Sequence, residues 1–410
     1  MTVPASTEKQ PKKILGLHPN VFFMGITSLL NDISSELIFT LLPLFMSNVL
    51  GTSSTIIGLV GGISDSADSL FRIISGWISD KIGKRKLLTV LGYAFSTAVK
   101  PFMLLANSWG VVAGVRFGDR VGKGVRTSSR DALIADSVEA KERGRSFGLH
   151  RAMDTSGAVI GLIIAAIIVY LIPGDKFHLE KNAYHWMVII GIIPAVLAVV
   201  VLMTLVHERK QITANVKAGI SKSAAITPFS NQFKLYLVVM ALFTLGNSSD
   251  FFLILDAQHV KTPLVQVVMM LVLFNITYAL ISMPMGVLSD KIGRKRVITI
   301  GWFIYGLVYL GFALSGSIWQ IWILFAVYGI FYGICEGAAK AFVADMVPAE
   351  RRGTAYGLYN GVVGLMALPA SLIAGVLWDR IAPAAAFYFG AGLALLAMVG
   401  MILIIKERRV

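Results

Sequence analysis

The sequence is poor in charged residues and in cysteine. Asp, Glu, Lys and Arg make up 15% of its 410 residues, whereas about a quarter of a typical soluble domain is charged. Cys335 is the single cysteine, which excludes an internal disulfide and a cysteine-based metal site. The six histidines lack metal-ligand spacing, and no glycine-rich phosphate-binding loop is present. These absences argue against an enzyme, a bound metal, a cofactor and an ATP-driven pump.

Long apolar runs take the place of the missing charge. Hydrophobic residues make up 56% of the chain, and runs of about 20 residues, enough to cross a bilayer core as a helix, recur throughout. The first run is too long for the apolar part of a signal peptide, so we expect no cleaved signal. The pattern predicts an all-α integral membrane protein with helices at about 20–46, 54–79, 87–106, 108–130, 144–172, 184–206, 234–258, 263–289, 296–315, 318–343, 354–378 and 384–405.

The net charge of +14 has two interpretations. A basic chain can bind nucleic acid, but membrane proteins also keep an excess of Lys and Arg on the cytoplasmic side. Here the basic groups fall in every second connection and at both termini. We therefore expect a lipid bilayer, and no nucleic acid, as the partner. Both termini would be cytoplasmic in the plasma membrane, which is the inner membrane in a bacterium.

The sequence repeats itself. Residues 76–86 (GWISDKIGKRK) match 286–296 (GVLSDKIGRKR), and residues 135–149 match 344–358 at nearly the same offset. The matches predict two six-helix halves in the same orientation, which is one known transporter plan with the binding site between the halves. The expected division is an N-terminal bundle at 1–206, a cytoplasmic linker at 207–233 and a C-terminal bundle at 234–410.

The first repeated motif, G-x-x-x-D-x-x-G-[RK]-[RK], resembles the signature loop of the major facilitator superfamily. The resemblance implies twelve transmembrane helices in two pseudo-symmetric bundles, with helices 1, 4, 7 and 10 lining a cavity and helices 3, 6, 9 and 12 outermost. It also implies that the motif is a latch that gates the transporter. From the residues alone, the motif can equally be a tight turn flanked by charges that set the membrane topology. The residues of the latch are Gly76, Asp80, Gly83, Lys84, Arg85, Gly286, Asp290, Gly293 and Arg294.

Ionisable residues inside the predicted spans are the candidate functional groups, because each costs about 2.5–3.5 kcal/mol to insert into a membrane. Asp32 and Glu36 are one helical turn apart and share a face. Either of them, or Asp154 beside His150 and Arg151, is a candidate for proton coupling. In the alternative interpretation, these acids and the neighbouring bases only hold the helices together.

A second group of residues is predicted to bind substrate. Arg116 and Arg120 share a helix face, and guanidinium groups pair well with carboxylate or phosphate. Drug–proton antiporters of the superfamily often carry an acid in the first span, which Asp32 matches, but they have Gln where this chain has Lys123 and Pro where it has Leu162, which argues against antiport and export. The dense basic residues of 116–131 are unusual for a carrier of lipophilic cations and would suit an anionic solute. Arg126 and Arg130 are expected at the cytoplasmic exit, where they would only set topology. The remaining predicted substrate-binding residues are Asn31, Asp250, Glu336, Tyr332 and Tyr359.

The sequence therefore predicts a monomeric secondary active transporter that moves a small organic solute by alternating access, driven by protons or another ion. Three alternatives stay open. The chain could be an uptake permease for an organic anion or a metal chelate. It could carry a metal ion on the oxygen ligands of Asn31, Asp32, Ser35, Asp65 and Asp68. It could also be a membrane receptor that transports nothing, which would need no titrating acid.

Overall fold

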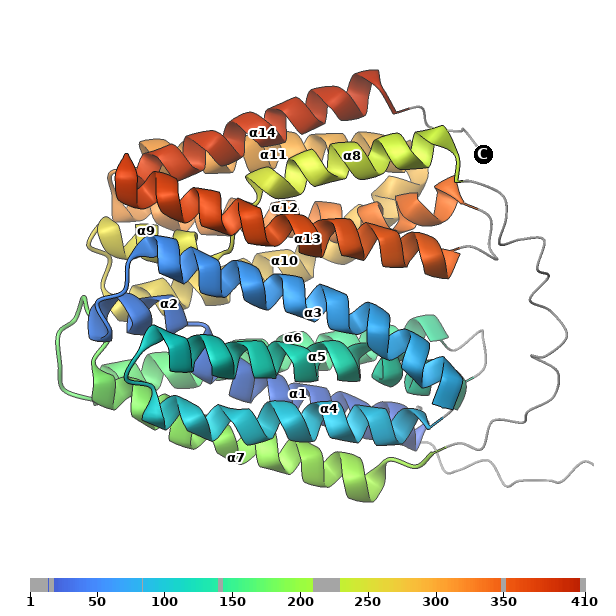
Figure 1. Cartoon of the computed structure of the whole chain (residues 1–410), viewed down its shortest axis with the longest axis horizontal. Helices are drawn as coiled ribbons and strands as arrows, with labels where there is room; N and C mark the ends of the chain where they lie inside the picture. Colours follow the sequence, from blue (N-terminus) through green and yellow to red (C-terminus); the bar gives the residue numbers. More distant parts are fainter. Residues whose placement is uncertain are drawn as a thin grey trace, which may run out of the picture.

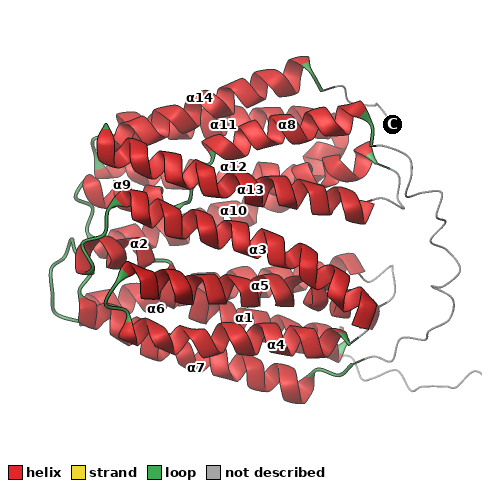
Figure 2. Cartoon of the chain, viewed as in Figure 1, coloured by secondary structure: helices red, strands yellow, loops and turns green. Residues whose placement is uncertain are grey.

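The computed structural model describes Ile14 and residues 18–82, 84–138, 143–208, 229–347 and 352–405. The described residues are almost entirely helical (Figure 2). The first half of the chain contains α1 (Pro19–Phe39), α2 (Leu42–Leu44), the π-helical turn η1 (Phe45–Val49), α3 (Ser54–Ile82), α4 (Arg85–Val99), the 3₁₀ turn η2 (Lys100–Leu105), α5 (Trp109–Ser137), α6 (Arg143–Leu171) and α7 (Lys181–Leu205).

The second half lies beside the first and repeats its plan (Figure 1). Its helices are α8 (Asn231–Gly246), α9 (Phe251–His259), α10 (Leu264–Ile292), α11 (Arg294–Leu314), α12 (Ile318–Met346), α13 (Arg352–Arg380) and α14 (Pro383–Leu403).

Two predicted helices, 20–46 and 234–258, are interrupted in the structure. The first breaks after Phe39, where Thr40 precedes α2 and Pro43 starts a new turn. The second breaks between Gly246 and Phe251, at the residues NSSD. Asn, Ser and Asp compete for backbone hydrogen bonds and Pro cannot donate one, so these residues favour helix ends. The breaks occupy equivalent places in the two halves.

Ten segments of the described chain are long and apolar enough to cross a membrane. Helices α3 and α5, of 29 residues each, are also long enough to cross a membrane, but they carry several charged residues and are not among these ten. Both are packed among the other helices, α3 along α13 and α5 along α3 and α4. With them the bundle has the twelve spans that the sequence predicts.

Hydrogen bonds join the two halves of the bundle at one of its two ends. We call the end at which α1 and α8 begin and α7 and α14 finish the linker end, and the opposite end the far end (Figure 1). At the far end the Asp379 carboxylate accepts hydrogen bonds from the backbone N–H groups of Ser54, at 3.1 Å, and Thr55, at 2.7 Å. Gln258 of α9 donates to Asn48 Oδ1 at 3.1 Å. Direct hydrogen bonds therefore hold the halves together at this end.

The outermost helices are the ones that the family resemblance implies. Helices α4 and α7 lie at one edge of the bundle, and α11 and α14 at the other (Figure 1). Their outward faces carry exposed apolar side chains such as Phe95, Ile193, Leu307 and Leu396. Such faces suit contact with lipid.

The two repeated motifs contact each other within each half. Arg85 at the start of α4 pairs with Asp136 of α5, and Arg294 at the start of α11 pairs with Asp345 of α12 at 3.1 Å. In both copies an arginine of the first motif reaches the aspartate of the second.

The other latch residues are placed as follows. Lys84 occupies the N-cap position of α4 without a capping hydrogen bond from its side chain, and Gly293 joins α10 to α11 with φ +98°, a conformation that glycine favours. Gly76 and Gly286 lie in α3 and α10. Gly83 and the side chains of Asp80 and Asp290 lie outside what the structure describes.

Glycines let α3 approach the backbone of α13 across the interface between the halves. A Cβ at Gly62 would lie 2.8 Å from the Leu368 Cα and 3.0 Å from the Leu368 carbonyl oxygen. A Cβ at Gly375 would lie 2.7 Å from the Thr55 Cα. Since backbone atoms cannot move aside as a flexible side chain can, larger residues at these positions would force the two helices apart.

We predict that Gly62→Leu separates α3 from α13 and opens the far end. Overpacking costs about 1–3 kcal/mol, so the labelling rate of a Thr55→Cys reporter by a maleimide should rise about fivefold or more. The control is Gly114→Leu in α5, because a Cβ at Gly114 meets no atom within 4 Å. Equal labelling rates in the two variants would contradict the prediction.

Candidate functional site

A cavity of about 270 Å³ lies between the halves, beside both helix breaks. Its wall combines a strongly charged N-terminal side with an aromatic and amide C-terminal side. The lining residues are Asp32, Ser35, Glu36, Phe39, Thr40, Gly61, Asp65, Arg116, Asp119, Arg120, Lys123, Arg126, Leu162, Ser249, Asp250, Phe251, Ile254, Leu271, Phe274 and Asn275.

Helix α5 supplies the positive charge of the cavity. Arg116 faces Asp119 at 3.6 Å. Arg120, Lys123 and Arg126 have no carboxylate within salt-bridge distance in the described part of the chain. Buried nitrogens of two of them, Arg120 Nε and one terminal nitrogen of Arg126, have no hydrogen-bond partner there. The cavity thus holds cationic donors that can bind an anion.

Arg126 corrects one sequence-based expectation. It was predicted to set topology at the cytoplasmic exit, but it is 3% exposed and lines the cavity. Its guanidinium lies 4.5 Å from the centre of the Tyr93 ring. The cation is therefore held on an aromatic face inside the bundle.

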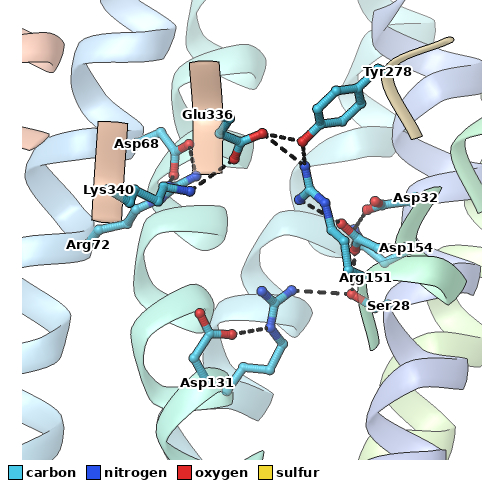
Figure 3. Close-up of polar contacts among 12 residues, drawn as sticks. Ser28, Asp32, Asp68, Arg72, Asp131, Arg151, Asp154, Tyr278, Glu336 and Lys340 are labelled. Carbon is cyan, nitrogen blue, oxygen red and sulfur yellow. Dashed lines mark hydrogen bonds and ion pairs between the residues drawn. The ribbon is translucent and has the colours of Figure 1, made fainter. Parts of the chain in front are cut away.

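Helix α1 supplies two of the cavity's acids, Asp32 and Glu36. The Glu36 carboxylate accepts a hydrogen bond from the Thr40 hydroxyl, at the helix break. The Asp32 carboxyl group is hydrogen-bonded to that of Asp154 on α6 (Figure 3). Asn31, which does not line the cavity, is 1% exposed and donates to Asp32 Oδ1 at 3.2 Å. The two acids of α1 therefore have different surroundings.

Close packing of α6 on α1 brings Asp154 to Asp32. A Cβ at Gly161 would lie 2.7 Å from the Ile33 carbonyl oxygen, and Gly157 lies against Leu29 in the same way. Such small residues four apart let two helices approach at the backbone. One turn before Gly157, Asp154 accepts a hydrogen bond from the Ser28 hydroxyl of α1 at 2.8 Å.

The Asp32–Asp154 pair continues into a polar network toward the linker end (Figure 3). Asp154 lies 3.6 Å from the Arg151 guanidinium. Arg151 also contacts the second half, where it donates to the Tyr278 hydroxyl and lies 3.4 Å from Glu336. Glu336 binds Lys340 at 2.9 Å. One arginine thus touches acids of both halves.

A fully buried lysine was not assigned a role from the sequence. Lys100, at the start of η2, is 0% exposed, and its ammonium donates to the hydroxyls of Ser34, at 2.8 Å, and Ser35, at 3.2 Å. The Lys-Pro dipeptide could have signalled the change from α4 to the 3₁₀ turn η2, but nothing in the sequence shows which helix the ammonium reaches. Lys100 ties η2 to α1 next to the cavity.

The C-terminal side of the cavity differs from the expectation that α12, the tenth span, lines it. In the described chain the lining comes from the break before α9, from α9 and from α10, and α3 and α6 contribute on the other side. The α12 residue Tyr328 stands behind the wall and donates to Asp250 Oδ1 at 2.6 Å. Bulky aromatic rings fill the space between α12 and the cavity.

Besides Asn31, three predicted substrate-binding residues lie away from the cavity wall. Tyr332 packs edge-on against Phe274, with ring centres 5.5 Å apart. Tyr359 stacks on Tyr236 at 6.3 Å. Glu336 lies toward the linker end with Arg151. By contrast, sequence reasoning did not single out Phe274 and Asn275 of α10, because neutral residues in an apolar helix give no signal.

Comparisons with known proteins agree with this architecture. A sequence profile of the Major Facilitator Superfamily matches residues 24–259 and again residues 251–410. An uncharacterized MFS-type transporter of Methanocaldococcus jannaschii is 40% identical over 390 residues, which cover 93% of this chain and 94% of the relative.

Two solved structures are similar in fold. A mutant of the nucleoside transporter NupG superimposes with a TM-score of 0.77 at 14% identity, covering 94% of this chain and all of that one. A POT family transporter in complex with a thioalcohol-conjugated peptide also gives 0.77, at 12% identity, covering 95% of this chain and 96% of that one. The twelve spans, the duplicated motifs and the two profile matches together establish that the chain belongs to the Major Facilitator Superfamily of membrane transporters.

Proposed function

We propose that this chain is a proton-coupled secondary transporter of a small organic anion. The observation that carries the proposal is the placement of the Asp32 and Asp154 carboxyl groups beside each other, with the Ser28 hydroxyl donating to Asp154 at 2.8 Å. Two neighbouring carboxylates repel each other, so the pair favours a state in which one of them carries a proton. Asp32 lines the cavity, so a proton on the pair can be exchanged there.

The preference for an anion rests on three cations that have no carboxylate within salt-bridge distance in the part of the chain that the structure describes. Arg120, Lys123 and Arg126 face the cavity without a carboxylate partner in the described chain. A carboxylate, sulfonate or phosphate group would supply the missing partner, and arginine binds such groups in a bidentate manner. The similar structures transport different solutes by name, nucleosides in one and peptides in another, so the substrate class is argued from this cavity alone.

The arrangement is less suited to a metal ion. Of the oxygen ligands considered from the sequence, Asn31 and Asp68 do not line the cavity, and Asp68 is bound at 2.7 Å by Arg72 of its own helix. Within the described residues no three side chains among His, Cys, Asp and Glu form a group that could hold a metal. Arginines beside the remaining acids would repel a cation.

Transport would proceed by alternating access between the two halves. We propose that the linker end faces the cytoplasm, with both termini and the 207–233 connection there, and that the far end faces outward. Hydrogen bonds across the halves at the far end support a conformation closed to the outside. Movement of one half against the other would then break these bonds and open the path to the outside.

Neutralising the carboxyl pair tests the coupling. Asp32→Asn and Asp154→Asn should each abolish uptake of a bound anion driven by a pH gradient in proteoliposomes, while exchange of labelled for unlabelled anion continues. The control is Asp175→Asn in the exposed connection after α6. There the Phe177 N–H donates to the carboxylate at 2.9 Å and lowers its pKa, so the control also removes an ionised group. Unchanged pH-driven uptake in both variants would rule out proton coupling through this pair.

A pair of probes with one ring and opposite permanent charges tests the substrate class. We expect benzenesulfonate, and not phenyltrimethylammonium, to bind the purified protein and raise its melting temperature. Arg120→Gln and Lys123→Gln should each weaken benzenesulfonate binding about tenfold or more, since a charged hydrogen bond contributes about 1.5–3 kcal/mol. The control is Lys181→Gln, at the first residue of α7, which lies at the far end of the bundle. Tighter binding of the cation would refute the anion proposal.

A further inference from the structure

A second, larger cavity lies next to the charged one. This space, which we call the chamber, measures about 900 Å³ and is enclosed by α6, α10 and α12. Its wall is mainly apolar, whereas the wall of the charged cavity is mainly polar. The chamber is lined by Arg151, Ala152, Thr155, Ser156, Val159, Ile160, Asn275, Ile276, Tyr278, Ala279, Leu280, Ser282, Gly333, Glu336, Gly337 and Lys340.

The two spaces adjoin at α10. Asn275 lines both of them, and the preceding residue, Phe274, lines the charged cavity while the next, Ile276, lines the chamber. The charged cavity alone is small, below the roughly 300–1,000 Å³ of typical ligand sites. A solute larger than this cavity would have to extend past Asn275 toward the chamber.

The charges of the two spaces differ in a way that orients such a solute. In the chamber the ions are already paired, because Glu336 is in contact with Lys340 and Arg151. In the charged cavity Arg120, Lys123 and Arg126 have no carboxylate partner among the described residues. An acidic group that enters the cavity can pair with these three cations, although five carboxylates also line it, and an apolar group is favoured in the chamber.

We propose that the transported solute is an amphipathic organic anion, whose acidic group binds in the charged cavity and whose apolar part occupies the chamber. This inference rests on the proposed function and names its substrate class more closely. Each methylene that enters the chamber leaves water, so affinity rises with the length of the apolar part. Leu280, 68% exposed, and Ile276, 42% exposed, lie at the outer edge of the chamber, so its apolar wall continues onto the surface that faces lipid.

The wall of the chamber offers a site at which to fill it. Gly337 of α12 lines the chamber, and a Cβ added there meets no atom within 4 Å. Gly337→Phe would place a ring in the chamber without a clash at the backbone. Ala279→Phe fills the same space from α10 and serves as the second variant. The matched control is Gly392→Phe, since Gly392 also lies within a helix, is exposed, and would carry a Cβ with no other atom within 4 Å.

The experiment measures dissociation constants of n-alkanesulfonates, from butanesulfonate to decanesulfonate, for the purified protein in lipid nanodiscs. The wild-type protein and Gly392→Phe should bind about fourfold more tightly for each added methylene, as expected from burial of one such group. In Gly337→Phe and Ala279→Phe the gain should stop at a shorter chain, while butanesulfonate binds as in the wild type. The n-alkyltrimethylammonium series should show no gain beyond its partition into empty nanodiscs.

Other outcomes separate this inference from the proposed function. If butanesulfonate binds through Arg120 but longer chains bind no better, the chamber does not hold the apolar part and only this inference fails. The same holds if a phospholipid copurifies with the wild type and is lost in Gly337→Phe, because the chamber then holds lipid. If no alkanesulfonate of any length binds to the folded protein, the proposed anion specificity fails as well.

Discussion

The cost of placing charged side chains in an apolar bundle determines how this protein is built. An unpaired ion in such surroundings is so unfavourable that it must be paired, hydrogen-bonded or exposed to water. Helices α3 and α5 carry most of the internal charge, and both lie where other helices and the cavity surround them. Contacts such as Asp68 with Arg72, Arg116 with Asp119 and Lys100 with two serine hydroxyls meet this requirement. The lipid-facing helices could then stay apolar.

The groups that escape this rule are the ones that suggest function. Arg120, Lys123 and Arg126 are held in the bundle without a carboxylate partner in its described part, and they all face one cavity. Keeping them there lowers stability unless a ligand or water compensates. The same argument applies to Asp32 and Asp154, whose carboxyl groups repel each other unless a proton lies between them.

Much of the fold could be predicted from the sequence, because membrane-spanning length, charge distribution and a duplicated motif are local or periodic signals. The site was predictable only in part. Spacing along one helix correctly placed Asp154 beside Arg151, three residues away. Contacts between helices could not be predicted. The hydrogen bonds from Lys100 to α1, the burial of Arg126 on Tyr93 and the placement of Asn275 all depend on how whole helices are rotated and tilted.

Arg151 shows how a proton in one half can affect the contact between the halves. Its guanidinium lies 3.6 Å from Asp154 and 3.4 Å from Glu336, so the two carboxylates, one from each half, attract the same cation. Asp154 also lies beside Asp32 of the cavity wall (Figure 3). Under the proposed proton coupling, a proton that moved onto Asp154 would weaken its attraction for Arg151 and leave the cation to Glu336. The proposal would thus link the charge state of the cavity, through a single side chain, to the polar contact that joins α6 to α10 and α12.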